Sequence, residues 1–244
     1  MSIYKRMSRL LARHTAHRWL PLNKGKGVVS FSFDDVPASA CREGAALLER
    51  YEARGTFYVC GGLTDGVEQN QPCHQVSDLQ RLVSRGHEVG CHTFSHTNCA
   101  EANLRFLRDD WRKNQDFFTE HNVKNSGFAF PFGAYDFPSK LAAASLFSYS
   151  RITGGGTHVG RADLNALRAQ SLYAGVTSDE TILNLIQNTA EEGGWLIFYS
   201  HEVSSSTGPW GTSPTQLESA LRIARQMSCE ILPVQSAIDY FRQP

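Results

Sequence analysis

Apolar residues recur along the chain in short runs, and stretches with helical periodicity separate many of these runs. The runs are rich in β-branched and aromatic residues, as buried strands are. Strands are therefore expected at Val28–Phe33, Thr56–Cys60, His87–Cys91, Gly127–Phe130, Tyr149–Thr153, Leu167–Tyr173, Trp195–Tyr199 and Glu230–Val234. Helices are expected at Cys41–Ala53, Val76–Arg85, Ala100–His121, Pro138–Leu146, Ser178–Glu191 and Pro214–Met227. This alternation predicts right-handed crossovers and a mostly parallel sheet, and about seven or eight such units predict an α/β barrel.

The first residues of the chain differ from the rest. A basic helix is expected from residue 3 to residue 20. Its apolar side chains share one side at three- and four-residue steps: Ile3, Met7, Leu10, Leu11 and His14. Such a helix either packs on the outside of the domain or lies on an anionic membrane surface, and both interpretations stay open. Residues 1–26 are expected to form this helix and its lead-in, and residues 27–244 a single barrel.

Charge is unevenly distributed along the 244 residues, although 24 basic and 24 acidic residues balance overall. The first 33 residues hold seven Lys or Arg and no acid, which leaves 17 basic against 24 acidic residues elsewhere. An acidic body argues against a nucleic-acid partner. No apolar stretch is long enough to span a membrane or to serve as a secretory signal, and six cysteines are too few for a disulfide scaffold. The expected location is the cytoplasm, with peripheral membrane contact as an alternative.

Polar residues directly follow several of the expected strands. In α/β barrels such positions carry the chemistry. The polar residues concerned are Asp34 and Asp35, His92 and His96, and His201, and the nonpolar segment Pro131, Phe132 and Gly133 follows the fourth strand in the same way. In a helical turn, histidines four apart lie on one face and can share a metal ion. With one carboxylate they make a catalytic site with open coordination positions.

Each of these features also has a simpler interpretation. The histidines could be ordinary surface or core residues, and Cys91 and Cys99 beside them could belong to a zinc knuckle. The two aspartates could cap the following turn. If they are functional, they cannot share one role, because adjacent side chains at a strand end point apart. One would then bind the metal while the other faces the reacting water.

Four short motifs occur in order: "SFDD", "HTFSH", "PFG" and "YSH". With them the chain resembles the NodB-homology polysaccharide deacetylases, carbohydrate esterase family four, from about Val28 to Val234. The resemblance implies a distorted (β/α) barrel of about seven parallel strands and a hydrolase that removes N-acyl groups from amino sugars. It also implies a divalent metal. Zn²⁺ is the ion expected, and Co²⁺ or Ni²⁺ would also suit the ligands.

The resemblance carries over to individual residues. Asp34 corresponds to the catalytic base of the family and His201 to its general acid. Asp35, His92 and His96 correspond to its metal ligands. The family's oxyanion donor corresponds to the backbone N–H of Phe132.

Other residues near the motifs are candidates for substrate binding. Phe132, Tyr135 and Tyr199 are expected to line the acyl pocket, and Gly133 to contribute to oxyanion or substrate binding. Trp210, in the Gly- and Ser-rich loop after "YSH", either stacks on a sugar ring or packs on the barrel rim.

The chain departs from the family pattern at two motifs. The family's third motif begins with an Arg that pairs with the catalytic Asp, and Ala129 stands there instead. Arg168 is the expected substitute, unless it is simply a solvated surface residue. The fourth motif, D-x-x-D-W, is missing, and Asp163 is the nearest acid that could orient the catalytic histidine.

Three functions remain as candidates. The first is a metal-dependent N-deacetylase of an amino sugar in a glycan. The second is a deacylase of lipid- or nucleotide-linked sugars in glycan assembly, which the basic N-terminal helix favours. The third is a catalytically impaired carbohydrate-binding barrel, which Ala129 favours.

Overall fold

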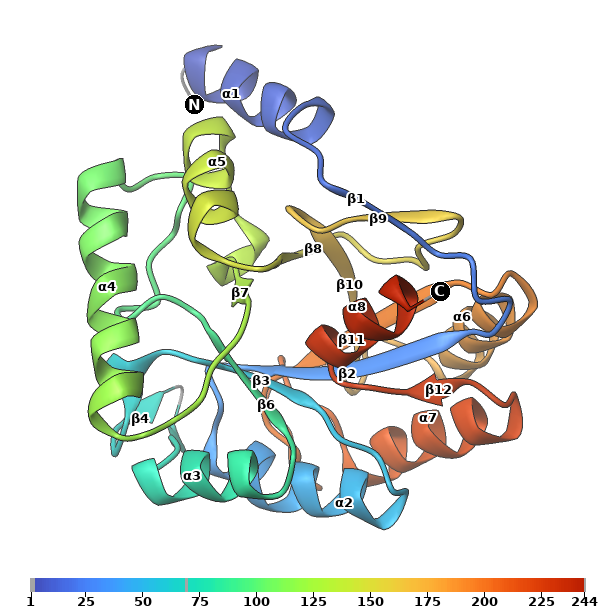
Figure 1. The fold of residues 1–244 in the computed structure, drawn as a ribbon. Coiled ribbons are helices and arrows are strands. Elements are labelled where there is room, and N and C mark those ends of the chain that lie inside the picture. The colour runs from blue at the N-terminus through green and yellow to red at the C-terminus, as the bar shows by residue number, and fades with distance from the viewer. Residues whose placement is uncertain (1–2, 69, 244) are drawn as a thin grey trace.

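The computed structural model describes residues 3–68 and 70–243, and its centre is a closed ring of seven parallel strands (Figure 1). In their order around the ring they are β2 (Val28–Asp34), β3 (Thr56–Val59), β6 (Glu88–Cys91), β7 (Phe128–Ala129), β8 (Ser150–Thr153), β10 (Leu167–Ser171) and β11 (Trp195–Ser200). The ring closes because β11 also pairs with β2, from Trp195 opposite Val28 to Ser200 opposite Phe33. The expected distorted (β/α) barrel is therefore confirmed.

Helices surround the ring, and Figure 1 shows α2 to α7 on its outside. They are α2 (Ala45–Arg50), α3 (Val76–Ser84), α4 (Leu104–Glu120), α5 (Phe137–Leu146), α6 (Asp179–Glu191) and α7 (Pro214–Gln226). Single π- and 3₁₀-helical turns occur at Ala40–Gly44, Gly61–Leu63 and Pro131–Gly133. Side chains of Asn103, Ser178 and Ser213 accept backbone N–H groups at the starts of α4, α6 and α7, which explains why these helices begin there.

Several short elements lie outside the ring. The expected strand at Glu230–Val234 is reduced to β12 (Glu230–Ile231), which adds to the start of β2. Two antiparallel pairs were not expected: β1 (Trp19–Pro21) with β9 (Arg161–Asp163), and β4 (Val67–Glu68) with β5 (Gln71–Pro72). A last helix, α8 (Val234–Arg242), was not expected either.

Side chains along β2 alternate between the two sides of the barrel wall, as the pleat of a strand requires. Val29, Phe31 and Phe33 belong to the apolar layer between the strands and the helices. Val28 belongs to a second cluster that fills the lower barrel with Trp195 and residues of α8. Asp34 has the same parity as Val28, so the alternation directs its carboxylate toward the inside of the barrel.

The barrel is closed at the end where its strands begin. The buried Glu88 carboxylate accepts hydrogen bonds from Tyr149 Oη at 2.6 Å, Thr56 Oγ1 at 2.8 Å and the backbone N–H of Gln235 in α8 at 2.9 Å. These bonds hold the first turn of α8 across the opening. At the opposite end, where the strands finish, a cavity remains between them.

The N-terminal helix is shorter than expected. It is α1 (Ile3–His14), and the prediction that it continues to residue 20 is wrong. Ala16 has a left-handed backbone with φ 55°, after which the chain becomes extended and joins β1. The change of direction is fixed by tertiary contacts, since Asp163 Oδ1 accepts the N–H of Arg18 at 2.9 Å. The basic helix and lead-in therefore contain one helix and one short strand.

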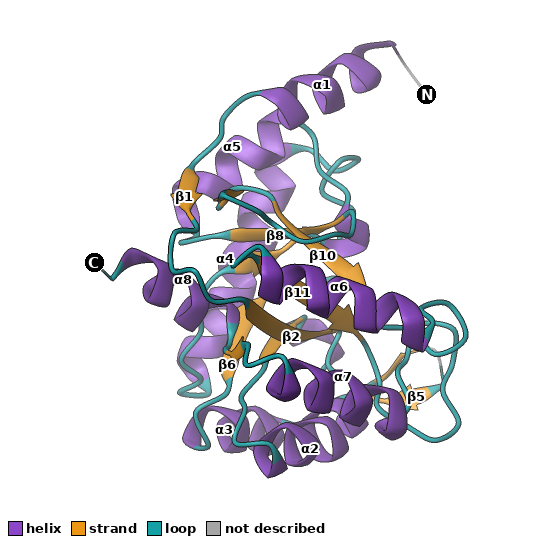
Figure 2. Ribbon diagram, turned by 90° about the vertical axis from the view of Figure 1, so that its right-hand side faces the viewer, coloured by secondary structure: helices purple, strands orange, loops and turns teal. Residues whose placement is uncertain are grey.

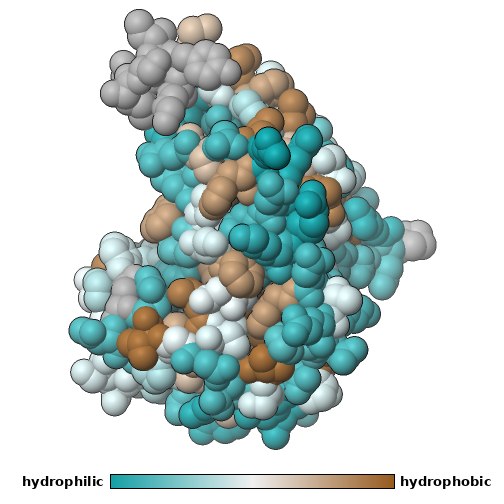
Figure 3. Space-filling model, turned by 90° about the vertical axis from the view of Figure 1, so that its left-hand side faces the viewer, coloured by the Kyte–Doolittle hydropathy of each residue, from teal (hydrophilic) through white to brown (hydrophobic). Residues whose placement is uncertain are grey.

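The apolar side of α1 faces away from the barrel. Ser8 and Ala12 are buried against α5, whereas Met7, Leu10 and Leu11 are 58%, 55% and 49% exposed. Figure 2 shows α1 projecting beyond the barrel, and Figure 3 shows hydrophobic side chains over the end formed by α1 and α5. Within the described part of the chain, no helix is long and apolar enough to cross a membrane.

Candidate active site

A cavity of about 520 Å³ opens where the barrel strands end, and it collects the motif residues. Its lining consists of Asp34, Asp35, His92, His96, Phe132, Gly133, Thr153, Tyr173, Tyr199, His201 and Trp210. These residues come from segments far apart in the sequence and meet because parallel strands finish at one end of the barrel. Tyr173 and Thr153 were not expected here.

The two adjacent aspartates both face this cavity, in spite of the alternation along β2. Asp35 has a left-handed backbone with φ 57°, and so does Val36 with φ 53°. The reversal brings the second carboxylate back to the side of the first. The buried His74 holds the strained Val36, because its backbone N–H and Nδ1 contact the Val36 carbonyl oxygen at 3.2 and 3.0 Å.

The spacing of the two histidines suggested a helical turn, but neither histidine lies on a helix. They lie in an irregular loop after β6, in which Thr93 and His96 have left-handed backbones with φ 65° and 51°. The loop is held from α4 by the buried Asp110, whose carboxylate accepts the N–H of Phe94 at 3.0 Å and the hydroxyl of Ser95 at 2.8 Å. This fold brings both imidazoles to Asp35.

Asp35, His92 and His96 form a cluster that suits a metal ion. The Nε2 atoms of His92 and His96 lie 3.7 and 3.2 Å from Asp35 Oδ1, and the three ligand atoms are all within 4.8 Å of one another. His92 Nδ1 lies 2.8 Å from the Ala129 carbonyl oxygen, a contact that fixes the ring and leaves Nε2 for the metal. Two imidazoles and one carboxylate are the donor set of a catalytic zinc site.

Burial acts strongly on this cluster. It lowers the pKa of His92 to about 3, against the attraction of Asp34, so the imidazole is neutral and able to coordinate. Burial also raises the pKa of Asp35 to about 6, and the charge of Asp34 adds to this effect. A bound cation would compensate both carboxylates, so the residues fit a divalent metal ion.

The zinc-knuckle alternative finds no support. The buried Cys91 thiol accepts a hydrogen bond from Asn114 Nδ2 at 3.2 Å, and the Cys99 thiol lies 3.5 Å from the Thr97 carbonyl oxygen. The metal-ligand cluster found in the described part of the chain contains neither of them.

Asp34 is paired with an arginine that the sequence did not identify. Arg151 Nη2 lies 2.5 Å from Asp34 Oδ1, and both side chains are buried. Arg151 stands on β8 directly opposite Ala129 on β7. Ala129 occupies the position at which the family pattern has an Arg. In-register residues of neighbouring parallel strands point to the same side, so Arg151 reaches the space that the short Ala129 side chain leaves.

This pairing decides the charge of Asp34. Burial alone would raise the pKa of its carboxyl group, but Arg151, followed by His92 and His201, holds the pKa below its ordinary value. The guanidinium carbon also lies 5.1 and 5.2 Å from the ring centres of Tyr58 and Tyr199, so both rings contact its charge.

Arg168 and Asp163 lie elsewhere. The guanidinium of Arg168 donates to the Thr157 carbonyl oxygen at 3.3 Å, so the expected pairing with Asp34 is replaced by that of Arg151. Asp163 lies between the N-terminal segment and α5, where it contacts His17 Nδ1 at 2.9 Å and Lys140 Nζ at 3.0 Å. Asp163 therefore anchors α1 and its lead-in and does not orient His201.

His201 faces the cavity from the end of β11. Its Nδ1 lies 3.2 Å from the Trp210 carbonyl oxygen, and its Nε2 lies 3.7 Å from Asp35 Oδ2. A backbone carbonyl thus takes the orienting place that a carboxylate has in the family pattern. Trp210 and Tyr199 contact Tyr173, with ring centres 5.6 and 5.4 Å apart, and together they form an aromatic wall.

The "PFG" loop forms the opposite wall. Phe132 is 64% exposed, has φ 59°, and its ring centre lies 4.6 Å from that of His96. At Gly133, a Cβ atom would lie 2.2 Å from Thr153 Oγ1, so only glycine allows this close approach. Tyr135 lies outside the cavity and lines a neighbouring one, contrary to the expectation that it borders the acyl pocket.

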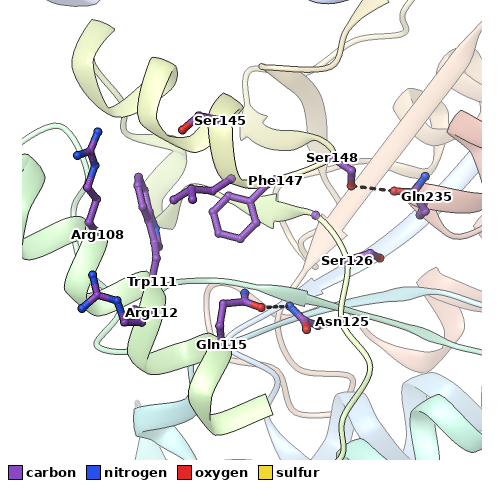
Figure 4. A pocket seen from close by; sticks show the side chains of 12 residues that line it. Arg108, Trp111, Arg112, Gln115, Asn125, Ser126, Ser145, Phe147, Ser148 and Gln235 are labelled. Carbon is purple, nitrogen blue, oxygen red and sulfur yellow. Dashed lines mark hydrogen bonds between the residues drawn. The ribbon is translucent and has the colours of Figure 1, made fainter. Parts of the chain in front are cut away.

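A different cavity, of about 810 Å³, lies beside α4 at the closed end of the barrel (Figure 4). Arg108 and Arg112 extend from α4, and Trp111 and Phe147 form an apolar surface between them and Ser148. None of the motif residues lines this cavity.

Comparisons with known proteins agree with the fold and the motifs. A family profile described as polysaccharide deacetylase matches residues 22–148. A bifunctional xylanase/deacetylase from Pseudobutyrivibrio xylanivorans is 29% identical over 99 residues, which are 41% of this chain and 14% of that protein. The match thus spans about one seventh of that relative's length.

Several solved structures superpose on nearly the whole chain. The chitin deacetylase of the fungal pathogen Colletotrichum lindemuthianum does so with a TM-score of 0.64, at 17% identity and over 89% of each chain. A peptidoglycan N-acetylglucosamine deacetylase gives 0.63 at 19% identity, over 89% of this chain and 90% of that chain. A CE4 family pseudoenzyme from Bacillus anthracis gives 0.61 at 15% identity, over 88% of this chain and 66% of that chain. These likenesses show the fold, and the fold alone does not decide activity.

Proposed function

Because this chain belongs to the polysaccharide deacetylase family, we propose that it is a metal-dependent hydrolase that removes an N-acyl group, expected to be acetyl, from an amino sugar. The observation that carries this proposal is the cavity shared by Asp34, the Asp35–His92–His96 cluster and His201. It unites a candidate base, a candidate metal site and a candidate acid. The substrate would be a glycan or a glycan precursor.

The metal site would consist of Asp35, His92 and His96. We propose Zn²⁺ as the ion, with Co²⁺ or Ni²⁺ as alternatives, since this ligand set suits all three. When bound, the ion would supply Lewis acidity to the acyl carbonyl and lower the pKa of an attacking water.

The remaining steps fall to the chain's own groups. Asp34 accepts a proton from the attacking water, since its pairing with Arg151 keeps the carboxylate ionised. The Phe132 backbone N–H donates to the oxyanion that develops on the acyl oxygen, a contact worth about 3 kcal/mol of barrier. The N–H of Gly133 is already used by the Phe130 carbonyl at 2.9 Å. His201 then protonates the leaving amine through Nε2.

The proposal is tested by acetate release from N-acetylated amino-sugar oligosaccharides, with metal content measured in the same samples. We expect release that stops on chelation and returns with Zn²⁺. His92→Ala should lose the metal, whereas Asp34→Asn should keep it and lose turnover. Equal metal loss in both variants would show that the division of roles is wrong.

A catalytically impaired carbohydrate-binding barrel is the second candidate, and Ala129 in the position of the family's Arg is the observation that favours it. Arg151 weighs against it, because it supplies the missing cation to Asp34. Full metal occupancy without acetate release from any N-acetylated sugar, together with unchanged sugar binding by Asp34→Asn, would support the binding protein.

Peripheral contact with an anionic membrane is a further proposal, and it concerns α1. Exposed Met7, Leu10 and Leu11 lie on the same helix as the exposed Arg13, a combination of apolar and basic side chains that suits an anionic lipid surface. Sedimentation with vesicles of phosphatidylglycerol should bring down the wild type and much less of a variant with all three apolar residues changed to Ser. Equal sedimentation of both proteins would exclude this contact.

A further inference from the structure

A second cavity, of about 560 Å³, adjoins the candidate active site and has a different chemistry. Gly133 and Thr153 line both cavities, so a single loop and strand end separate them. The two cavities are therefore immediate neighbours, and a ligand that passes over this wall would reach both. Its lining includes three arginines from three different segments: Arg13 of α1, Arg161 of β9 and Arg168 of β10.

The charge of this lining is strongly positive. Among the described residues that line the cavity, Asp163 is the one acid, and its carboxylate is already bound to Lys140 Nζ at 3.0 Å, His17 Nδ1 at 2.9 Å and the N–H of Arg18 at 2.9 Å. No carboxylate forms an ion pair with the three arginines in the part of the chain that the structure describes. Their charge is therefore left for a ligand.

The contacts of the arginines hold them in place without neutralising them. Arg161 lies over the Trp19 ring, with its guanidinium carbon 4.1 Å from the ring centre. The charge of Arg13 acts on the Tyr135 hydroxyl, where burial raises the pKa and Arg13 opposes the rise, and Arg168 donates to the Thr157 carbonyl oxygen at 3.3 Å. Each keeps further N–H donors, since a guanidinium has five.

The position of Arg13 depends on a buried lysine. Lys140 of α5 donates to the carbonyl oxygens of Ala12 and Thr15 at 2.9 and 3.0 Å, just before and after Arg13. The backbone that carries this arginine is thus tied to the barrel. A guanidinium presented in this way matches the oxygen atoms of a phosphate group, which it binds through paired hydrogen bonds.

We propose that this second cavity binds a phosphate or diphosphate group on the substrate, so that the protein acts on an amino sugar linked to a phosphate ester. The inference rests on the proposed deacylase function and specifies its substrate class. Nucleotide-linked and lipid-linked sugars share this chemistry, and the exposed arginines alone do not distinguish them.

The test compares acetate release from three N-acetylglucosamine compounds: a neutral chito-oligosaccharide, the uridine diphosphate sugar and a polyprenyl diphosphate sugar in detergent. We expect kcat/KM to be at least about tenfold higher for one of the diphosphate compounds, since charge-assisted hydrogen bonds are worth more than 1.4 kcal/mol. The better of the two identifies the carrier. The ratio to the neutral substrate should fall toward one in the triple variant Arg13→Gln, Arg161→Gln, Arg168→Gln, mainly through KM.

A binding measurement makes the outcome independent of turnover. Calorimetric titration with inorganic pyrophosphate should give a Kd at least about tenfold weaker in the triple variant than in wild type. The single variant Arg13→Gln changes one exposed helix position, so weaker pyrophosphate binding by this variant cannot be explained by a folding defect. Arg112→Gln on α4 removes an exposed arginine outside the cavity and should bind pyrophosphate as wild type does. Arg168→Lys, which keeps the charge, should retain part of the affinity.

The two proposals fail in different ways. Pyrophosphate binding that depends on the arginines, without acetate release from any compound, would support the phosphate site and overturn the deacylase function. Acetate release with equal kcat/KM for neutral and diphosphate substrates, together with pyrophosphate binding that the triple variant does not weaken, would overturn the phosphate site and leave the deacylase function standing.

Discussion

The pairing of Arg151 with Asp34 makes a prediction about stability that is independent of substrate. Both side chains are buried, and Arg151 Nη2 lies 2.5 Å from Asp34 Oδ1. Arg151→Met keeps a long side chain between Tyr58 and Tyr199 but leaves an uncompensated carboxylate inside the barrel. Breaking one partner of a buried pair lowers the free energy of unfolding by about 3–5 kcal/mol.

The double variant gives the sharper measurement. Asp34→Asn with Arg151→Met removes both charges, and replacing a whole buried pair is often nearly neutral. We therefore expect the double variant to be more stable than Arg151→Met alone, with a coupling energy of at least about 2 kcal/mol. Urea unfolding gives the free energy of unfolding of Arg151→Met, of Asp34→Asn and of the double variant. A chelator is present throughout so that metal binding does not contribute.

Arg112→Gln is the control for loss of an arginine as such. Its side chain is 69% exposed and lies 3.3 Å from Asp109, so its removal should change stability by less than about 0.5 kcal/mol. A loss below about 1 kcal/mol in Arg151→Met, or a double variant whose loss equals the sum of the single losses, would refute the assignment.

Three further changes test other parts of the structure. Gly133→Ala should lose about 1–3 kcal/mol of stability and reduce turnover, because its Cβ would lie 2.2 Å from Thr153 Oγ1, whereas Gly156→Ala, with nothing within 4 Å, should keep activity. Burial lowers the pKa of His158 to about 4, and an unfolded histidine titrates near 6.5, so protonation favours the unfolded chain as the pH falls. The stability difference between wild type and His158→Gln should therefore change by about 3 kcal/mol from pH 7 to pH 4, as followed by urea unfolding, and a constant difference would contradict this reasoning. Lys140→Met should expose residues 3–18 to limited proteolysis, since Lys140 binds two carbonyl oxygens in that segment, and unchanged cleavage would argue against this anchoring role.

The sequence correctly predicts which residues meet at the candidate site where those residues lie close together in the chain at the end of a strand. Apolar runs located the barrel strands to within one or two residues, and the motifs after them, Asp34–Asp35, His92, His96 and His201, meet in one cavity. These features are local, so a single sequence reveals them.

Arg151 could not be assigned from the sequence because its role depends on the register between two strands. Within "YSRIT" it resembles an ordinary interruption of an apolar run, and only the pairing of β7 with β8 places it opposite Ala129. One signal was available: a charge in the middle of a buried strand is costly unless it is paired.

The end of the N-terminal helix differs from the prediction for a similar reason. The helix was expected to continue past His14 to residue 20, but Asp163 binds the N–H of Arg18 from a strand far along the chain. That contact and the pairing of β1 with β9 override the local preference. Such long-range competition cannot be predicted from periodicity alone.

The seam between β11 and β2 has a consequence for how the chain folds during synthesis. Ser32 of β2 donates to the carbonyl oxygen of Phe198 in β11, across a separation of 166 residues. The strand β2, which carries the candidate base, is therefore among the first strands to be synthesised and among the last to be fully paired. Until β11 has emerged, the nascent chain exposes one edge of β2, and unpaired strand edges recruit other chains. A chain terminated at residue 148, where the family profile ends, would keep Asp34, Asp35 and both histidines and yet stay open at this seam. We expect such a fragment to aggregate.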